Sequence, residues 1–169
     1  MNKYICFDTE TTGLSANDEI LSLAIVNQDN EVLFYELFKP LNITRWDEAE
    51  RIHGISPDDV KDKKSILEFK NEIINIFNDY DCVIGYNVNY DIMMILNNLN
   101  INICNNHNII DVMKIFAEIY GEWNSYRNSY RWQKLSTCAD YYGYEFKAHN
   151  ALEDVKATIY CYKQMLLNC

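Results

Sequence analysis

The chain has 169 residues, of which 49% are hydrophobic and 24% charged, proportions typical of a globular protein. They predict a single domain over residues 1–169 and exclude disordered and fibrous proteins. The net charge of −10 argues against tight, sequence-independent binding to duplex DNA, but it allows a nucleic-acid enzyme whose carboxylates bind divalent cations.

The first half of the chain changes from strand-like to helix-like spacing of its apolar residues. We expect three strands and then two helices, at Lys3–Phe7, Ile20–Val26, Val32–Phe38, Arg45–Ile52 and Ile66–Phe77. A polar turn over residues 29–31 predicts that the second and third strands pair as an antiparallel hairpin. Ser65 is expected to cap the second helix.

Strands and helices alternate in the second half. The expected elements are a strand at Cys82–Gly85, a helix containing Asp91–Leu99, an edge strand at Ile109-Ile110, and helices at Val112–Tyr120, Gln133–Tyr142 and Ala151–Leu167. The stretch Asn97–Asn108 is expected to be mostly loop, and Asp111 to cap the following helix. This order predicts an α/β protein with a mixed sheet flanked by α-helices.

The sequence also bears on cellular location. The apolar run Ile20–Val26 is too short to cross a membrane, and Asp8 arrives before the apolar stretch of a signal peptide could form. We therefore expect a cytoplasmic protein with no membrane partner. The six cysteines form no C-x-x-C pair and are predicted to be reduced thiols: Cys6, Cys82, Cys104, Cys138, Cys161 and Cys169.

The first pair of candidate carboxylates lies at the end of the first predicted strand. Asp8 and Glu10 lie two residues apart, so on an extended chain both carboxylates point to one side. Mg²⁺ and Mn²⁺ prefer such oxygen ligands, which makes the pair a candidate half of a metal site. Taken alone, the pair is more typical of a solvated strand end.

Two further segments carry acids near helix starts. Asp91 lies in the first turn after a strand, where it either stabilises the helix or faces a cation. Asn150 and Glu153 resemble a capping box, which predicts a helix beginning at residue 151 and leaves His149 on the preceding loop. From that loop His149 can approach the place that Asp154 faces, although a surface histidine and helix-terminal acidity would also explain these two residues.

Taken together, these segments resemble the motifs of the DEDD superfamily of 3′-to-5′ exonucleases. The matching stretches are Asp8-Thr9-Glu10-Thr11-Thr12-Gly13, Gly85 to Asp91 and His149 to Asp154. Histidine at position 149, five residues before the last acid, is the pattern of the histidine subclass. The resemblance implies a ribonuclease H-like fold and two divalent cations, Mg²⁺ or Mn²⁺, held by Asp8, Glu10, Asp91 and Asp154. It also implies that His149 is the general base for an attacking water, a role in which histidine is common.

The same resemblance implies substrate-binding residues, namely Thr11, Thr12, Gly13, Leu14 and Asn87. Leu14 either wedges against the terminal base or plugs the core, and the two threonines either bond the terminal sugar or close the turn. Tyr86 departs from the histidine that relatives often have, and we expect this change to affect packing or contact with the strand, not the metals. His53 is expected to pack and not to catalyse.

The segment Trp123–Lys134 interleaves four aromatic residues with three basic ones. This combination suits a single-stranded nucleic acid, because bases stack on aromatic rings and cations follow phosphates. The alternative is a surface loop whose rings cover the neighbouring helix.

The leading hypothesis is a metal-dependent 3′-to-5′ exonuclease that acts on single-stranded 3′ ends, with DNA favoured, and releases nucleoside 5′-monophosphates. One alternative keeps the fold but makes the substrate RNA. Another is a proofreading module whose role is to dock to a DNA polymerase partner. The sequence leaves the oligomeric state open.

Overall fold

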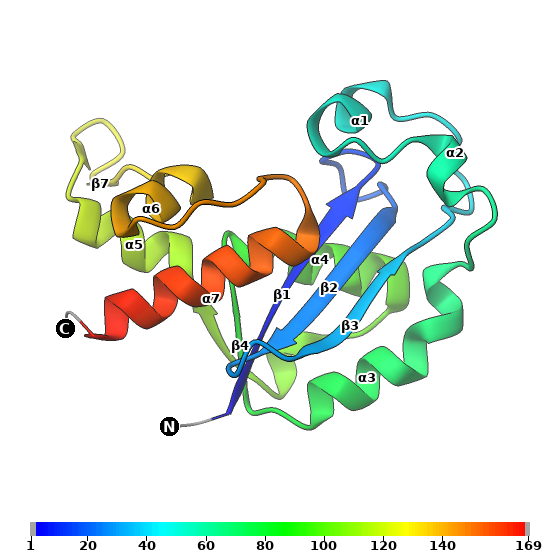
Figure 1. Cartoon of the computed structure of the whole chain (residues 1–169), viewed down its shortest axis with the longest axis horizontal. Coiled ribbons are helices and arrows are strands. Elements are labelled where there is room, and N and C mark those ends of the chain that lie inside the picture. Colours follow the sequence, from blue (N-terminus) through cyan, green and yellow to red (C-terminus); the bar gives the residue numbers. More distant parts are fainter. Residues whose placement is uncertain (1–2, 168–169) are drawn as a thin grey trace.

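A mixed five-stranded sheet forms the centre of the protein (Figure 1). The computed structural model describes residues 3–167. The strands are β1 (Tyr4–Thr11), β2 (Ile20–Asn27), β3 (Val32–Leu37), β4 (Cys82–Gly85) and β5 (Asn108–Asp111). Their order is β3-β2-β1-β4-β5, in which β1-β2 and β2-β3 are antiparallel and β1-β4 and β4-β5 are parallel. The predicted mixed sheet is confirmed.

Helices cover both faces of this sheet. They are α1 (Asp47–His53), α2 (Pro57–Val60), α3 (Lys70–Asn78), α4 (Val88–Leu99), α5 (Val112–Tyr120), α6 (Leu135–Tyr142) and α7 (Ala151–Leu167), with 3-10 turns η1 (Ile66–Phe69) and η2 (Ile103–Asn105). Alternating side chains of β1 divide between two cores: Ile5 and Phe7 pack with residues of α3 and α4, whereas Tyr4 and Cys6 pack with residues of α5, α6 and α7. The α7 face is thus the face toward which Asp8 and Glu10 point.

The first strand is longer than the sequence predicts. Its pairing with β2 continues to Thr11, which lies opposite Ile20, so the acids at positions 8 and 10 lie inside the strand and not beyond its end. The pairing with β4 is shorter and ends where Cys6 lies opposite Ile84. From residue 7 onward, one edge of β1 is therefore free of a neighbouring strand.

Other elements also differ from prediction. Residues 66–77 form η1 followed by α3 and not one helix, because the 3-10 turn places Ile66 and Phe69 on one side against the core. Ser65 caps this turn as expected and accepts a hydrogen bond from the N–H of Leu67 at 3.3 Å. The short helix α2 was not predicted, although Ser56 and Asp59 form a capping box that marks its start.

Several boundaries in the second half match the prediction. Strand β4, the start and end of α5, and the start of α7 lie at the expected residues. Helix α4 ends at Leu99, as expected for the helix containing Asp91–Leu99. The described cysteines are free, and Cys169 lies outside the described residues. Among residues 3–167, no helix has the length and apolarity needed to span a bilayer.

Candidate active site

Three carboxylates meet on the α7 face of the sheet. Oxygens of Asp8, Glu10 and Asp154 lie within 4.8 Å of one another. The first two project from β1 with the strand period of two, and Asp154 projects from the first turns of α7, which packs across β1 and β2. One oxygen of Asp154, Oδ1, is buried without a hydrogen-bond partner among the described residues. The cluster therefore has lone pairs free for a cation.

The electrostatics of the cluster favour protonation or a bound cation. Burial, helped by the charges of Asp91, Asp154 and Glu10, raises the pKa of Asp8 well above its ordinary range. Burial followed by the charges of Asp154 and Asp91 raises the pKa of Glu10 to about 8. Burial raises the pKa of Asp154 to about 6. Each shift records the cost of gathering negative charge away from water.

Asp91 occupies a different position from the other three acids. It is 3% exposed on α4 and accepts hydrogen bonds from the backbone N–H of Thr9 at 3.0 Å and from the Thr9 hydroxyl at 2.6 Å. Thr9 lies on the edge of β1 that β4 leaves free, so the carboxylate replaces a missing strand partner. Burial raises the pKa of Asp91 to about 7 despite these hydrogen bonds. The charge of Asp91 also helps to raise the pKa of Asp8.

His149 lies on the loop before α7, as the capping pattern predicts. The side chain of Asn150 accepts a hydrogen bond from the N–H of Glu153 at 3.2 Å, which fixes the helix start. His149 has a left-handed backbone with φ of 65°, and its N–H donates to Oδ2 of Asp154 at 3.2 Å. Its exposed side chain lines one cavity together with Glu10 and another together with Asp154. The imidazole thus lies beside the carboxylate cluster.

A cavity of about 680 Å³ opens next to the cluster. Its floor is the first motif, from Thr9 to Leu14, and its far wall comes from α1 and the residues before it. Leu14 is 86% exposed, so it lies at the surface of the cavity and does not plug the core. The wall residues were missed by the sequence analysis, and they include Arg45, Trp46, Ile52 and His53.

His53 supports the cavity wall through its ring nitrogens. Nδ1 accepts a hydrogen bond from the N–H of Ile55 at 3.0 Å, so the neutral ring carries its proton on Nε2. Nε2 then donates to the carbonyl of Thr11 at 3.2 Å. Burial lowers the pKa of His53, which favours this neutral form. The ring joins α1 to the end of β1, a packing role like the one expected.

The hydroxyls of the first motif are engaged within the protein. Thr11 and Tyr90 hydroxyls lie 2.7 Å from each other, and each lies 2.7 Å from the carbonyl oxygen of Gly13. The Thr12 hydroxyl donates to Asp18 at 2.7 Å. A Cβ at Gly13 would lie 2.8 Å from the same Asp18 carboxylate, which explains glycine there. The structure thus gives these threonines a role in shaping the turn.

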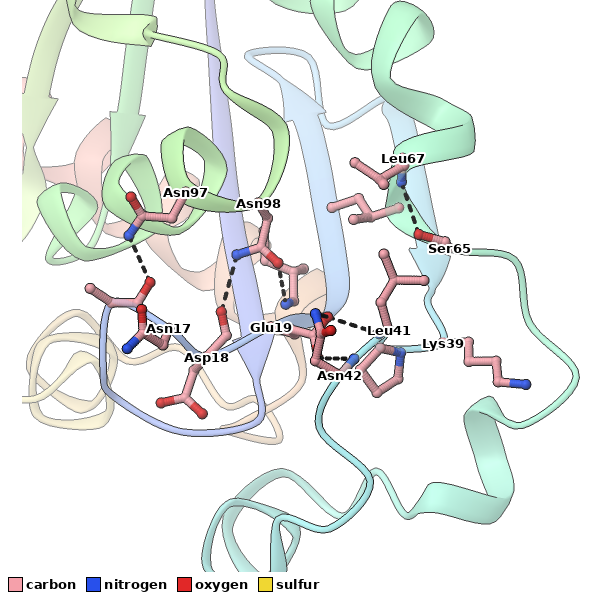
Figure 2. Close-up of a pocket in the computed structure, with 14 residues that line it drawn as sticks. Asn17, Asp18, Glu19, Lys39, Leu41, Asn42, Ser65, Leu67, Asn97 and Asn98 are labelled. Atoms are coloured by element: carbon pink, nitrogen blue, oxygen red, sulfur yellow. Dashed lines mark hydrogen bonds between the residues drawn. The ribbon is translucent and has the colours of Figure 1, made fainter.

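Behind this turn lies a second, polar cavity of about 590 Å³ (Figure 2). From the end of α4, Asn98 donates to the carbonyl of Asp18 at 3.1 Å and accepts from the N–H of Ile20 at 3.2 Å. Asn97 donates to the carbonyl of Ala16 at 3.0 Å. These amides anchor the loop that carries Leu14. The residues that line this second cavity therefore hold the candidate site in shape.

The second motif is held by a helix cap. Asp111 Oδ1 accepts from the N–H of Met113 at 3.2 Å, as predicted, and from the N–H of Asn87 at 3.1 Å. Asn87 has a left-handed backbone with φ of 61°, and its side chain is exposed. Tyr86 donates its hydroxyl to the carbonyls of Gln133 at 3.0 Å and Lys134 at 3.2 Å. Tyr86 therefore packs against the segment before α6.

Ser22 is a further residue that the sequence analysis missed. It lies opposite Glu10 in the β1-β2 ladder, and its hydroxyl is buried without a hydrogen-bond partner among residues 3–167. The sequence carries one signal for it. Ser22 is a polar residue in an otherwise apolar strand, and it lies on the same side of that strand as Ala24 and Val26.

The geometry can be compared with known proteins. A family model for exonucleases, RNase T, matches residues 5–162. The chain belongs to the exonuclease family. An uncharacterized exonuclease of Escherichia phage 186 is 31% identical in an alignment of 165 positions that covers 92% of this chain and 84% of the phage protein. The interpretation as a DEDD-superfamily exonuclease, a hydrolase, is thereby confirmed.

Two further likenesses agree with this assignment. DNA polymerase III subunit epsilon of Buchnera aphidicola is 27% identical in an alignment of 134 positions that covers 70% of this chain and 57% of that protein. The zinc-bound structure of Escherichia coli exonuclease I with single-stranded DNA superposes with a TM-score of 0.76 at 24% identity. That superposition covers 99% of this chain and 41% of exonuclease I, so the chain spans less than half of it. The ribonuclease H-like fold is confirmed.

Proposed function

We propose that the chain is a 3′-to-5′ exonuclease that uses Mg²⁺ or Mn²⁺ and removes nucleoside 5′-monophosphates from single strands, with DNA favoured. The main support for this proposal is the cluster of Asp8, Glu10 and Asp154 next to a cavity of about 680 Å³. Partly buried carboxylates that form no ion pair among the described residues favour a divalent ion, and the cavity has the size of a small-molecule site.

The donor set fits divalent cations. Its atoms are carboxylate oxygens, which hard ions prefer, and Oδ1 of Asp154 is buried and unpartnered within the described chain. Asp8, Glu10 and Asp154 would hold the cations, with Asp91 contributing beside Asp8. When bound, two such ions supply charge neutralisation to the phosphodiester and its leaving oxygen.

The protein's own residues then perform positioning and proton transfer. The cavity between the first motif and α1 receives the terminal nucleotide, with Leu14 at its base and the backbone of Thr11 to Gly13 along its floor. His149 accepts a proton from the attacking water as the water oxygen bonds to phosphorus. The bond from phosphorus to the 3′ oxygen breaks, and that oxygen takes up a proton from solvent. The products are a 5′-monophosphate and a strand with a new 3′ hydroxyl.

The substrate class and partners follow from the likenesses. Binding of single-stranded DNA by exonuclease I supports single-stranded DNA over RNA as substrate. The likeness to the epsilon subunit supports a DNA polymerase as a partner, a proposal that co-purification with a polymerase tests.

The test is an assay with end-labelled DNA and RNA strands and either Mg²⁺ or Mn²⁺. A strand labelled at its 5′ end is expected to shorten stepwise, and a strand labelled at its 3′ end to release labelled mononucleotide at once. Chelator and Asp8→Ala are expected to abolish both results, whereas Asp79→Ala, a change at an exposed acid after α3, leaves them intact. Internal cuts, shortening from the 5′ end or metal-independent cleavage would each overturn the proposal.

A further inference from the structure

The segment from residue 123 to residue 134 is a folded hairpin that the proposed reaction does not use. Strands β6 (Trp123–Asn124) and β7 (Ser129–Tyr130) pair antiparallel and project from the connection between α5 and α6 (Figure 1). The side-chain oxygen of Asn124 accepts the backbone N–H groups of Tyr126 at 3.1 Å and Arg127 at 3.2 Å, which fixes the turn. These two strands were not predicted.

The base of the hairpin is also fixed. The N–H of Arg131 donates to the carbonyl of Glu122 at 2.8 Å, and their side chains form an ion pair at 3.2 Å. Gln133 donates to the same Glu122 carboxylate at 2.9 Å. A shape fixed before binding loses less conformational entropy when a ligand arrives.

The aromatic rings of the hairpin face solvent. Tyr126 is 96% exposed at the tip, Trp132 is 59% and Trp123 is 52% exposed. Trp123 and Tyr130 pack edge to face on each other at 5.1 Å. Tyr126 therefore covers no helix, and the exposed parts of Trp123 and Trp132 are available for stacking.

The hairpin is basic in a strongly acidic chain. Arg127, Arg131 and Lys134 lie within eight residues of a protein whose net charge is −10. Arg131 is paired with Glu122, whereas the exposed side chains of Arg127 and Lys134 form no ion pair with the part of the chain that the structure describes. Free cations beside exposed rings match the alternating phosphates and bases of a single strand.

The hairpin is continuous with the carboxylate cluster. Trp132 and Lys134 line a cavity of about 400 Å³ together with His149 and Asp154. His149 also lines the cavity proposed for the terminal nucleotide. The hydroxyl of Tyr86 holds the carbonyls of the residues that follow Trp132, which fixes the hairpin to the end of β4. A strand with its 3′ end in the first cavity can thus pass His149 and reach the hairpin.

We propose that this hairpin binds the nucleic-acid strand on the 5′ side of the scissile phosphodiester. Trp132 stacks with a base near the cleavage site, Tyr126 stacks with a base farther upstream, and Arg127 and Lys134 contact the phosphates between them. The inference rests on the proposed exonuclease function and adds a binding surface to it. Because of this surface, strands long enough to reach the hairpin bind more tightly than shorter ones.

The test compares strands of different length in the full chain. Hydrolysis of the p-nitrophenyl ester of thymidine 5′-monophosphate reports chemistry without an upstream strand, and oligothymidylates of increasing length report upstream binding. Tyr126→Ala is expected to raise KM for long strands by about fivefold, and to leave kcat and the ester unchanged. Arg127→Gln is expected to reduce the slope of log affinity against log salt by about 0.7. Trp132→Ala is expected to affect shorter strands than Tyr126→Ala does.

Lys3→Gln is the matched control, because it removes one exposed positive charge at the opposite end of β1. If hairpin variants and Lys3→Gln give the same KM and salt slope on long strands, the proposal is overturned. Equal losses on the ester and on long strands would also overturn it, because the hairpin would then act through the fold of the site. If the parent chain hydrolyses neither substrate, the proposed function itself fails, and affinity for oligothymidylate measured by fluorescence anisotropy still decides the hairpin's role.

Discussion

The two faces of β1 use carboxylates in different ways. On the α7 face, Asp8, Glu10 and Asp154 come together with a buried oxygen that has no partner among the described residues. On the α4 side, Asp91 is also an aspartate of these motifs, but its carboxylate accepts two hydrogen bonds from Thr9. The first group is costly to assemble without a cation, whereas Asp91 also holds an unpaired strand edge. The comparison shows that the four motif carboxylates do not contribute equally to the stability of the fold.

Activity should separate the two sides most strongly. Asp8→Asn keeps the size of the side chain but removes a charge from the cluster, so we expect kcat to fall by about a thousandfold through lost metal stabilisation of the transition state. Asp91→Asn keeps an oxygen that can accept from Thr9, and we expect a smaller fall. The measurement is single-turnover cleavage of labelled oligonucleotide at saturating Mg²⁺. Equal falls would show that the two sides are equivalent in catalysis.

Stability should separate the two sides with opposite signs. Asp91→Ala leaves the N–H and hydroxyl of Thr9 without their acceptor, which is expected to lower the free energy of unfolding by about 1–3 kcal/mol. Asp8→Ala removes repulsion within the cluster and is expected to raise the stability of the metal-free protein at pH 8. Urea denaturation in chelator measures both changes. A loss of stability in both variants would contradict the comparison.

The sequence shows one side of this comparison better than the other. Period-two spacing places Asp8 and Glu10 on one face, and the Asn150-Glu153 capping pattern fixes the start of α7, so the convergence of three acids could be predicted. The hydrogen bonds of Asp91 could not, because they depend on β4 ending before β1 does, and strand register is a tertiary property.

The wall of the cavity and the hairpin after α5 could not be predicted from the sequence either. The wall of the cavity comes from α1, and the helical spacing that predicts this helix does not show that it faces the first motif. Trp46 and His53 reach the first motif only once the intervening strands have folded, so no local signal marks them. The hairpin after α5 has strands of two residues each, too short to show alternation.

The dependence of stability on pH tests the cost of the cluster. The pKa rises from 4.5 to about 8 for Glu10 and from 3.8 to about 6 for Asp154 on folding. Between pH 4 and pH 8 the folded protein thus binds more protons than the unfolded chain, so the free energy of unfolding falls as pH rises. We expect metal-free protein to lose stability across this window, and saturating Mg²⁺ to restore more of it at pH 8 than at pH 5. Stability that rises with pH in chelator would contradict this expectation, and Glu10→Gln should flatten the curve.

The smallest expected effect extends the comparison to the residue next to Asp91. Tyr90 also projects from α4, and its hydroxyl contacts the carbonyl of Gly13 and the hydroxyl of Thr11. Tyr90→Phe removes these contacts and leaves the cluster's charges untouched, so we expect a loss of about 0.5–1.5 kcal/mol in unfolding free energy. Since the turn carrying Leu14 lines the cavity proposed for the terminal nucleotide, KM should rise severalfold while kcat changes little. A fall in kcat with unchanged KM would mean that the α4 side takes part in the chemical step and does not merely hold the site in shape.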